Sequence, residues 1–189
     1  MSNNETRQKL IDSAKKEFFE NGFAKASLRK ICTNAGVTTG ALYFFFKNKD
    51  DLFSAIVAPP LIKLKEMLIE HNREDEEYLG SQDKQTRSVE NQLSTHKEAV
   101  TMVGYLYDNY DAFLLLLTKS QGSVYENCVD EFVALMEEGF RSGAEALLKN
   151  MPGCRIDEYM LHWLAHMDIE MFIHLLTHVP EKEKGVAYA

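Results

Sequence analysis

The sequence has few cysteines, prolines and glycines: three, four and ten in 189 residues. The cysteines, Cys32, Cys128 and Cys154, are widely spaced and odd in number, which argues against a disulfide framework and a four-cysteine metal site and fits a reducing cytoplasm. No apolar run approaches the roughly 20 residues that cross a bilayer. Residues 1–9 are polar and have no following apolar stretch, so they do not form a signal peptide. We therefore expect a cytoplasmic protein without a membrane partner.

Motifs of common enzyme classes are also missing. There is no Gly-rich phosphate loop, no catalytic carboxylate pair and no nucleophile beside a base, so we predict neither enzymatic activity nor a cofactor. Near the C-terminus, five metal-binding side chains follow one another at four-residue steps: His162, His166, Glu170, His174 and His178. Two histidines four apart can bind a metal from one helix face. Successive steps drift by about 40° around the helix, so the stripe cannot converge on one ion and no metal site is predicted.

Acidic charge predominates but is unevenly distributed. The chain carries a net charge of −8; residues 1–55 contain nine Lys/Arg and six Asp/Glu, whereas residues 56–189 contain twelve and twenty-three. DNA binding requires a local basic face rather than a basic chain, and an acidic remainder would repel phosphate and help to orient the molecule. A local surplus of three positive charges is equally compatible with chance.

Helical spacing of apolar residues dominates the chain, and no long segment alternates with period two, which predicts an all-α fold. The first helix has four apolar residues on one face and stops at Gly22: Leu10, Ile11, Ala14 and Phe18. The clearest break is Pro59-Pro60, and we divide the chain into a DNA-binding domain at 1–58 and a helical regulatory and dimerisation domain at 59–189.

Beyond Pro60 the pattern predicts a helix to about residue 71. Residues 72–92 are almost wholly polar and form either a loop or the exposed end of a long helix; we favour a short loop near Gly80. Further helices are expected over 87–108, 110–118, 124–149 and 156–178, with stops at Gly122, Pro152-Gly153 and Pro180.

The segment from Ser27 to Phe46 has the spacing of a helix-turn-helix. Ser27 is expected to cap a short helix over 28–34, and Thr38 a second over 39–45. The turn Ala35-Gly36-Val37 would set the two helices roughly perpendicular. Spacing of this kind is by itself a weak signal, because many helical hairpins share it.

A longer sequence pattern strengthens the helix-turn-helix prediction. Over about 50 ungapped residues the sequence resembles the N-terminal domain of the TetR family, in which a helix ending in Gly-aromatic is followed by Ser/Thr, Ala-Gly-Val-Ser/Thr, Leu/Phe-Tyr-x-x-Phe and Lys. The matching positions are Arg7, Ile11, Ala14, Phe18, Gly22-Phe23, Ser27-Leu28, Ile31, Ala35-Gly36-Val37-Thr38, Gly40, Leu42-Tyr43, Phe46, Lys47, Lys49 and Leu52.

The resemblance implies an N-terminal helix-turn-helix domain, a helical C-terminal ligand-binding and dimerisation domain, and double-stranded DNA as partner. Thr39 and Ala41 match positions that face base edges, and Arg29 matches a position where some members carry a base-contacting arginine. Tyr43 and Lys49 match residues that contact phosphates. The remaining predicted DNA contacts are Ser27, Thr38, Gly40 and Phe44.

One position departs from the family pattern. Phe45 stands where His or Tyr is common, and a phenylalanine cannot donate a hydrogen bond to phosphate. We expect Phe45 to pack against the first helix. A thymine-methyl contact from Phe44 and a weakened phosphate clamp at Phe45 are the alternatives.

The last long helix is apolar on two sides. One side has Leu161, Leu164, Ala165, Phe172, Leu175, Leu176 and Val179, and an adjacent strip has Met160, Trp163, Met167 and Met171. A helix this apolar is buried on both sides, which predicts a homodimer through the C-terminal helices, as the resemblance also implies. A two-fold dimer would bind a palindromic operator.

Aromatic residues and methionines are frequent in the middle of the C-terminal region. Most belong to a core, but helix bundles also bind ligands between their helices. We expect a small apolar or aromatic effector among Tyr105, Phe113, Trp163 and Met167. The function predicted from the sequence is therefore a DNA-binding regulator, a repressor released by such an effector. The alternative is a dimeric helical adaptor that has lost sequence-specific DNA binding.

Overall fold

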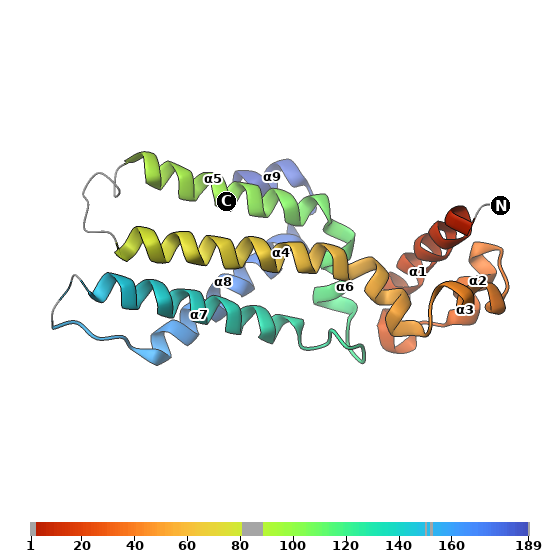
Figure 1. Ribbon diagram of the computed structural model, residues 1–189. Coiled ribbons are helices and arrows are strands. Elements are labelled where there is room, and N and C mark those ends of the chain that lie inside the picture. The colour runs from red at the N-terminus through yellow and green to blue at the C-terminus, as the bar shows by residue number, and fades with distance from the viewer. Residues whose placement is uncertain (1–2, 81–88, 150, 152, 189) are drawn as a thin grey trace. The chain divides into compact units, whose positions relative to one another are not determined.

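The computed structural model describes residues 3–80, 89–149, 151 and 153–188, and within these ranges it contains helices and no strands (Figure 1). The predicted all-α fold is confirmed. No helix among the described residues is both long and apolar enough to cross a membrane. The helices are α1 (Asn3–Lys25), α2 (Leu28–Ala35), α3 (Thr39–Phe45), α4 (Lys49–Gly80), α5 (Val89–Asp108), α6 (Tyr110–Lys119), α7 (Cys128–Leu148), α8 (Glu158–His178) and α9 (Lys182–Ala187).

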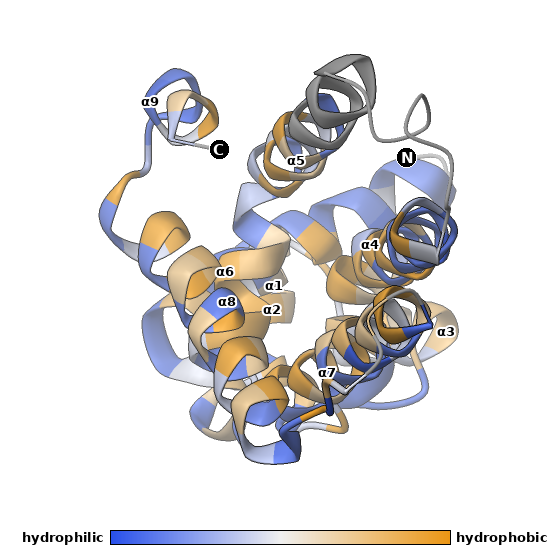
Figure 2. Cartoon of the chain, turned by 90° about the vertical axis from the view of Figure 1, so that its left-hand side faces the viewer, coloured by the Kyte–Doolittle hydropathy of each residue, from blue (hydrophilic) through white to orange (hydrophobic). Residues whose placement is uncertain are grey.

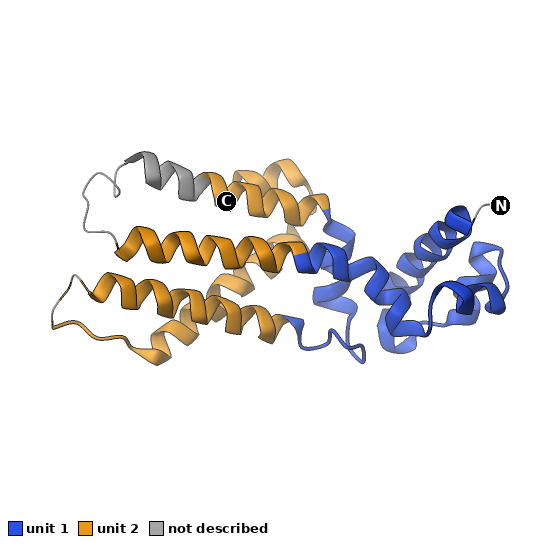
Figure 3. Ribbon diagram, viewed as in Figure 1, with its two compact units in different colours: residues 1–62, 109–128 blue, residues 63–108, 129–189 orange. Residues whose placement is uncertain are grey.

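The chain forms two compact units (Figure 3). Unit 1 comprises the chain as far as Ile62 together with Asn109–Cys128, and unit 2 comprises Lys63–Asp108 and the chain from Val129 onward. The division predicted from the sequence follows chain order alone, whereas residues 109–128 join unit 1 through tertiary contacts, chiefly those of α6 with α1.

Unit 1 is built around fully buried side chains from several helices. Leu10, Ala14 and Phe18 of α1 are buried as their spacing predicts. The Phe18 ring meets Phe53 of α4 edge-on, with ring centroids 5.0 Å apart. From α6, Phe113 belongs to the same unit and is 2% exposed. This core supports α2 and α3, which are too short to be stable helices by themselves.

Gly22 interrupts α1 where a stop was predicted. Its φ of 71° and ψ of 164° lie outside the helical region, in backbone space that favours glycine. One further helical turn follows and ends at Lys25. The expected break is therefore present, but the helix resumes briefly before α2.

The helix break predicted at Pro59-Pro60 is wrong, because α4 runs through both prolines. Each interior proline removes a backbone donor and crowds the preceding turn. Buried Val57 and Leu61 flank the pair, and tertiary burial of this kind supplies most of the stability of a helix. The polar residues from 72 onward form the far end of α4, which ends at Gly80, where the short loop was expected.

The start of α7 and the presence of α9 also differ from the sequence prediction. α7 begins at Cys128 rather than 124, because the preceding residues form turns in which the Ser123 and Glu126 amides donate to the Ser120 and Ser123 carbonyls. The short helix α9 follows Pro180 and was not predicted.

Polar contacts join the helices of unit 2. The part of α4 in this unit runs beside α5 and α7 (Figures 1 and 2). Lys65 Nζ lies 2.6 Å from a Glu131 carboxylate oxygen on α7, and His71 Nδ1 lies 3.2 Å from Glu98 Oε2 on α5. The Tyr107 hydroxyl donates to the Val179 carbonyl at 2.6 Å, which satisfies a carbonyl at the C-terminal end of α8.

Candidate nucleic-acid interface

The local structure of Ser27 to Phe46 is the predicted helix-turn-helix. The Ser27 hydroxyl accepts a hydrogen bond from the Lys30 amide, and the Thr38 hydroxyl accepts one from the Ala41 amide. Both side chains thus act as N-caps, as predicted. Between the helices, Gly36 has φ 68° and ψ 32°, and its amide donates to the Thr33 carbonyl. This left-handed conformation is the reason a glycine suits the turn.

The inner side of the motif is a small apolar core. Ile31 and Cys32 of α2, Leu42 of α3 and the following Phe46 are buried. Burial raises the pKa of the Cys32 thiol, and a hydrogen bond with the Thr39 side chain offsets this only in part. Cys32 is therefore a protonated core residue at neutral pH.

The outer side exposes most of the residues predicted to contact DNA. Tyr43 is 55% exposed and Phe44 72% exposed, although both are large apolar or aromatic side chains in a helix that packs on a core. The other exposed members of the predicted set are Ser27, Arg29, Thr38, Thr39 and Gly40, whereas Ala41 is half-buried. The exposed residues of α2 and α3 and their N-caps thus include hydroxyls, one arginine and two aromatic rings, and we call this set of residues the α2–α3 face.

Lys49, another predicted DNA contact, already has partners within unit 1. Its ammonium donates to the carbonyls of Ala24 at 3.0 Å and Ala26 at 3.4 Å, and it lies 4.6 Å from the centroid of the Phe23 ring. Lys49 thereby holds the start of α4 to the end of α1. An ammonium has three donors, so one N–H remains for a further acceptor.

Phe44 and Phe45 form a pair at the exposed end of α3. Their rings meet edge-on with centroids 4.9 Å apart, and Phe45 is half-buried beside Phe46 at 6.4 Å. Phe44 is the more exposed ring of the pair. The predicted roles of the two rings toward DNA stay predictions.

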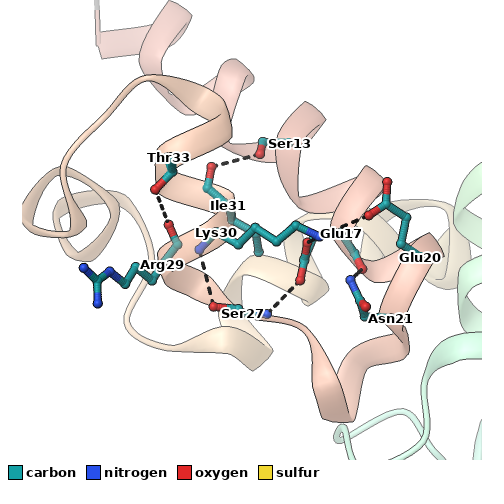
Figure 4. Close-up of polar contacts among 9 residues, drawn as sticks. All are labelled: Ser13, Glu17, Glu20, Asn21, Ser27, Arg29, Lys30, Ile31 and Thr33. Atoms are coloured by element: carbon teal, nitrogen blue, oxygen red, sulfur yellow. Dashed lines mark hydrogen bonds and ion pairs between the residues drawn. The ribbon is translucent and has the colours of Figure 1, made fainter.

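An ion pair that was not predicted from the sequence joins the buried carboxylate of Glu17 on α1 to the exposed ammonium of Lys30 on α2 (Figure 4). Glu17 of α1 is 3% exposed; its Oε2 lies 2.8 Å from Lys30 Nζ, and its Oε1 accepts the Ser27 amide at 3.2 Å. Burial raises the pKa of Glu17, but the hydrogen bonds from Lys30 and Ser27 and the charge of Lys30 outweigh it, so the pKa lies below its ordinary value. The hydrogen bond to Glu17, with that to Glu20, raises the pKa of Lys30. Both groups are therefore charged at neutral pH.

A signal for Glu17 is present in the sequence. It lies three residues after Ala14 and next to Phe18, on the face of α1 that the apolar spacing buries. A carboxylate on such a face requires a partner of opposite charge. Lys30 could have been proposed as that partner only once α2 was placed against α1.

The four residues predicted to contact an effector are divided between the units. Phe113 is in the core of unit 1, whereas Tyr105, Trp163 and Met167 belong to unit 2. Tyr105 is half-buried, and burial, with the nearby charge of Glu66, raises its pKa. Trp163 and Met167 are 47% and 50% exposed on α8. An effector site at these residues stays a prediction.

Unit 2 has a groove of about 340 Å³ between α4 and α5. Its lining combines two methionines with mostly charged groups: Lys63, Glu66, Met67, Glu70, His71, Glu74, Glu98, Thr101 and Met102. The charge of Glu98, together with burial, raises the pKa of Glu74. The groove differs in chemistry from the aromatic site that the sequence predicts.

α8 carries an exposed apolar stripe. Leu161, Ala165 and Ile169 face the core of unit 2, as does Leu176. The exposed residues, which we call the α8 stripe, are Tyr159, Met160, Trp163, Leu164, Met167 and Met171. Leu164 therefore lies with the strip of methionines and not with the core side to which the sequence assigned it. Apolar residues recur on more than one side of this helix (Figure 2).

Comparison with known proteins finds relatives of the N-terminal part of the chain. Residues 10–56 match the family described as bacterial regulatory proteins, tetR family. The chain is 50% identical over 52 residues to the HTH-type transcriptional regulator AcrR of Shigella flexneri, covering 28% of this chain and 24% of that protein. It is 35% identical over 71 residues to the HTH-type transcriptional repressor BepR of Brucella suis, covering 38% and 34%. The matches thus span no more than about a third of these relatives.

The likeness to solved structures extends over the whole chain. NalD, described as the secondary repressor of the MexAB-OprM multidrug efflux pump in Pseudomonas aeruginosa, aligns with a TM-score of 0.59 over 98% of this chain and 91% of its own. The sequence identity is 20%, so this likeness concerns the fold. An N-terminal helix-turn-helix domain followed by a helical domain is common to both.

Proposed function

We propose that this chain, whose N-terminal segment belongs to the TetR family of bacterial regulatory proteins, is a DNA-binding regulator of transcription that acts as a repressor. The observation that carries the proposal is the α2–α3 face: two capped helices at helix-turn-helix spacing with hydroxyl, guanidinium and aromatic groups exposed over a buried core. The relative BepR is named a repressor.

Each exposed group suits a different part of a DNA duplex. Thr39 and Ala41, in the first turn of α3, face base edges in the major groove, and Gly40 lets the backbone approach closely. The fork of Arg29 fits guanine O6 and N7. The hydroxyls of Ser27, Thr38 and Tyr43 and the remaining donor of Lys49 contact phosphates and fix the register.

Phe44 supplies an apolar contact beside these polar groups. Its ring is the most exposed of the three consecutive phenylalanines and is supported edge-on by Phe45. A thymine methyl is the apolar group that the major groove offers. Phe44 therefore favours an A·T pair at the position it reaches, whereas Phe45 contributes support and no hydrogen bond.

A second copy of the chain covers the α8 stripe. Monomeric proteins rarely leave a contiguous patch of large apolar side chains in water. A two-fold dimer buries the same patch on both copies. Trp163 and Met167 of one copy would therefore pack against the α8 stripe of the other. Two α2–α3 faces would then be spaced by about one helical turn, ~34 Å, or a multiple of it.

An effector that binds the helical body releases the DNA. Residues 109–128 come from the middle of the chain, yet they contact the DNA-binding segment within unit 1. The Val124 amide donates to Asp50 at 3.1 Å and the Tyr125 hydroxyl donates to Ser54 at 3.0 Å. Any ligand that shifts these residues would move the start of α4 and, with it, α3.

The effector is a small apolar or aromatic compound that contacts Tyr105, Phe113, Trp163 or Met167. The fluorescence of Trp163, the single tryptophan, provides a direct probe. A hydrophobic compound that raises the melting temperature and weakens DNA binding supports this part of the proposal. If none of a broad set does either, effector release is contradicted while DNA binding stands.

The competing function is a dimeric adaptor without sequence-specific DNA binding. The net charge of −8 and the absence of a hydrogen-bond donor at Phe45 favour it. Selection from a random-sequence library of DNA duplexes distinguishes the two. Enrichment of an inverted repeat by the intact chain, lost in the variant Arg29→Ala/Tyr43→Phe, supports the regulator. Failure to enrich any sequence at low salt supports the adaptor.

A further inference from the structure

We infer that Glu17 is a positioning residue for DNA binding: its buried carboxylate holds Ser27 and Lys30 so that the start of α2 is presented to the duplex in one orientation. This inference rests on the proposed function. Glu17 makes no DNA contact itself, because it lies on the inner side of α1 and is 3% exposed.

The contacts of Glu17 concentrate on the first turn of α2. One carboxylate oxygen accepts the Ser27 amide, the residue before the helix, and the other lies 2.8 Å from the ammonium of Lys30. The Ser27 hydroxyl in turn accepts the Lys30 amide at 3.3 Å. Glu17 therefore holds both ends of the turn that contains Arg29.

A second polar contact fixes the middle of α2. The Ser13 hydroxyl, one turn earlier on α1, donates to the Ile31 carbonyl at 2.9 Å. The Asn21 side chain donates to the Glu17 carbonyl and extends the contacts along α1. α2 is thus held to α1 at two points. These contacts restrict both rotation of α2 about its axis and sliding of α2 along α1.

Arg29 and Lys30 leave α2 in opposite directions (Figure 4). The ammonium of Lys30 points back toward α1, where it forms ion pairs with Glu17 and Glu20. Arg29 is exposed, and its guanidinium has no side-chain partner among the residues that the structure describes. Without the carboxylate, Lys30 would be free to turn outward, and the orientation of Arg29 would no longer be fixed.

Variants of Glu17 and Lys30 can distinguish an effect on the orientation of α2 from an effect on the stability of the fold. Removing Lys30 alone leaves the buried carboxylate of Glu17 without its counter-charge and destabilises the fold, whereas replacing both partners by apolar residues is often neutral or stabilising. The double variant Glu17→Leu/Lys30→Met keeps the net charge and restores an apolar contact, but it leaves the Ser27 amide without its acceptor. In contrast, Glu17→Gln/Lys30→Met keeps the net charge and retains a carbonyl oxygen for that amide.

The test measures affinity for a duplex that the parent chain has selected from a random-sequence library, together with the melting temperature of each protein. We expect Glu17→Leu/Lys30→Met to melt within a few degrees of the parent, because the new apolar contact offsets the lost polar contacts. It should bind about tenfold more weakly, because the start of α2 is no longer held in one orientation. Glu17→Gln/Lys30→Met should bind within about threefold of the parent, which is below the effect of one hydrogen bond.

The outcomes are distinguishable. If the parent enriches no duplex, the proposed function fails. If the parent binds and the Leu/Met variant binds equally well, Glu17 is not a positioning residue. A loss of affinity that follows the melting temperature in both variants, or loss of the helical fold in either, shows a purely structural ion pair and also overturns the inference. Glu20→Gln, at an exposed carboxylate beside Lys30, is the control and should leave affinity unchanged.

Discussion

The α2–α3 face and the α8 stripe are two exposed surfaces that a partner could cover, and they differ in composition and origin. The α2–α3 face combines hydroxyls, a guanidinium and two aromatic rings, and comes from about 20 consecutive residues. The α8 stripe consists of methionine, leucine and aromatic side chains along one helix. The first suits phosphates and base edges, and the second suits another apolar surface. A charge introduced into each should therefore affect different equilibria.

The largest expected effect comes from a charge in the α8 stripe. In Trp163→Glu, burying a carboxylate in the dimer interface leaves it unpaired, so the protein should become monomeric in analytical ultracentrifugation. Two linked half-site contacts then become one, and affinity for the selected duplex should fall by about 10²–10⁴-fold. Ile69→Glu, at an exposed apolar residue on α4 outside the α8 stripe, is the control. If Trp163→Glu remains dimeric, the assignment of the α8 stripe is wrong.

A change at Arg29 should affect affinity without affecting assembly. Removing a bidentate contact to guanine in Arg29→Ala should cost about 1–3 kcal/mol and relax specificity at one base pair. The measurement is a titration of the selected duplex and of duplexes substituted at each position. Lys63→Ala, which removes an exposed charge in unit 2, controls for the general electrostatic contribution. Equal losses on every duplex would assign Arg29 to a phosphate instead.

The turn between α2 and α3 should be sensitive to a side chain. Ala at position 36 would have to adopt φ near 68°, which costs about 1–2 kcal/mol in an L-residue. Gly36→Ala should therefore lower the melting temperature by a few degrees and weaken DNA binding. Gly40→Ala is the matched comparison, because Gly40 is helical and the nearest atom to an added Cβ is 3.8 Å away. It should not destabilise the fold, so a loss of affinity there would reflect close approach to DNA.

The smallest expected effect is the loss of one hydroxyl. Tyr43→Phe should reduce affinity for all duplexes by about 1 kcal/mol, the contribution of one hydrogen bond, with no change in melting temperature because the side chain is exposed. Tyr188→Phe, at an exposed tyrosine outside both surfaces, should change neither. If Tyr43→Phe binds as tightly as the parent, the phosphate contact is excluded.

The contrast between the two regions also explains what the sequence could predict. The helix-turn-helix depends on local signals, namely the caps at Ser27 and Thr38 and the glycine at the turn, and the structure has all of them. The uninterrupted α4 was mispredicted because burial on either side of Pro59-Pro60 outweighs a local rule. The ion pair of Glu17 with Lys30 and the return of residues 109–128 to unit 1 depend on contacts between distant segments, which periodicity does not report.

The most direct test of the account changes the spacing between the two halves of the selected inverted repeat. Inserting about five base pairs, half a helical turn, places the second half-site on the opposite side of the duplex. If two α2–α3 faces are joined through the α8 stripes, affinity should fall to that of a single half-site, and a full-turn insertion should recover part of it. Equal affinity for all three spacings would contradict a dimer that binds DNA through paired helix-turn-helix motifs.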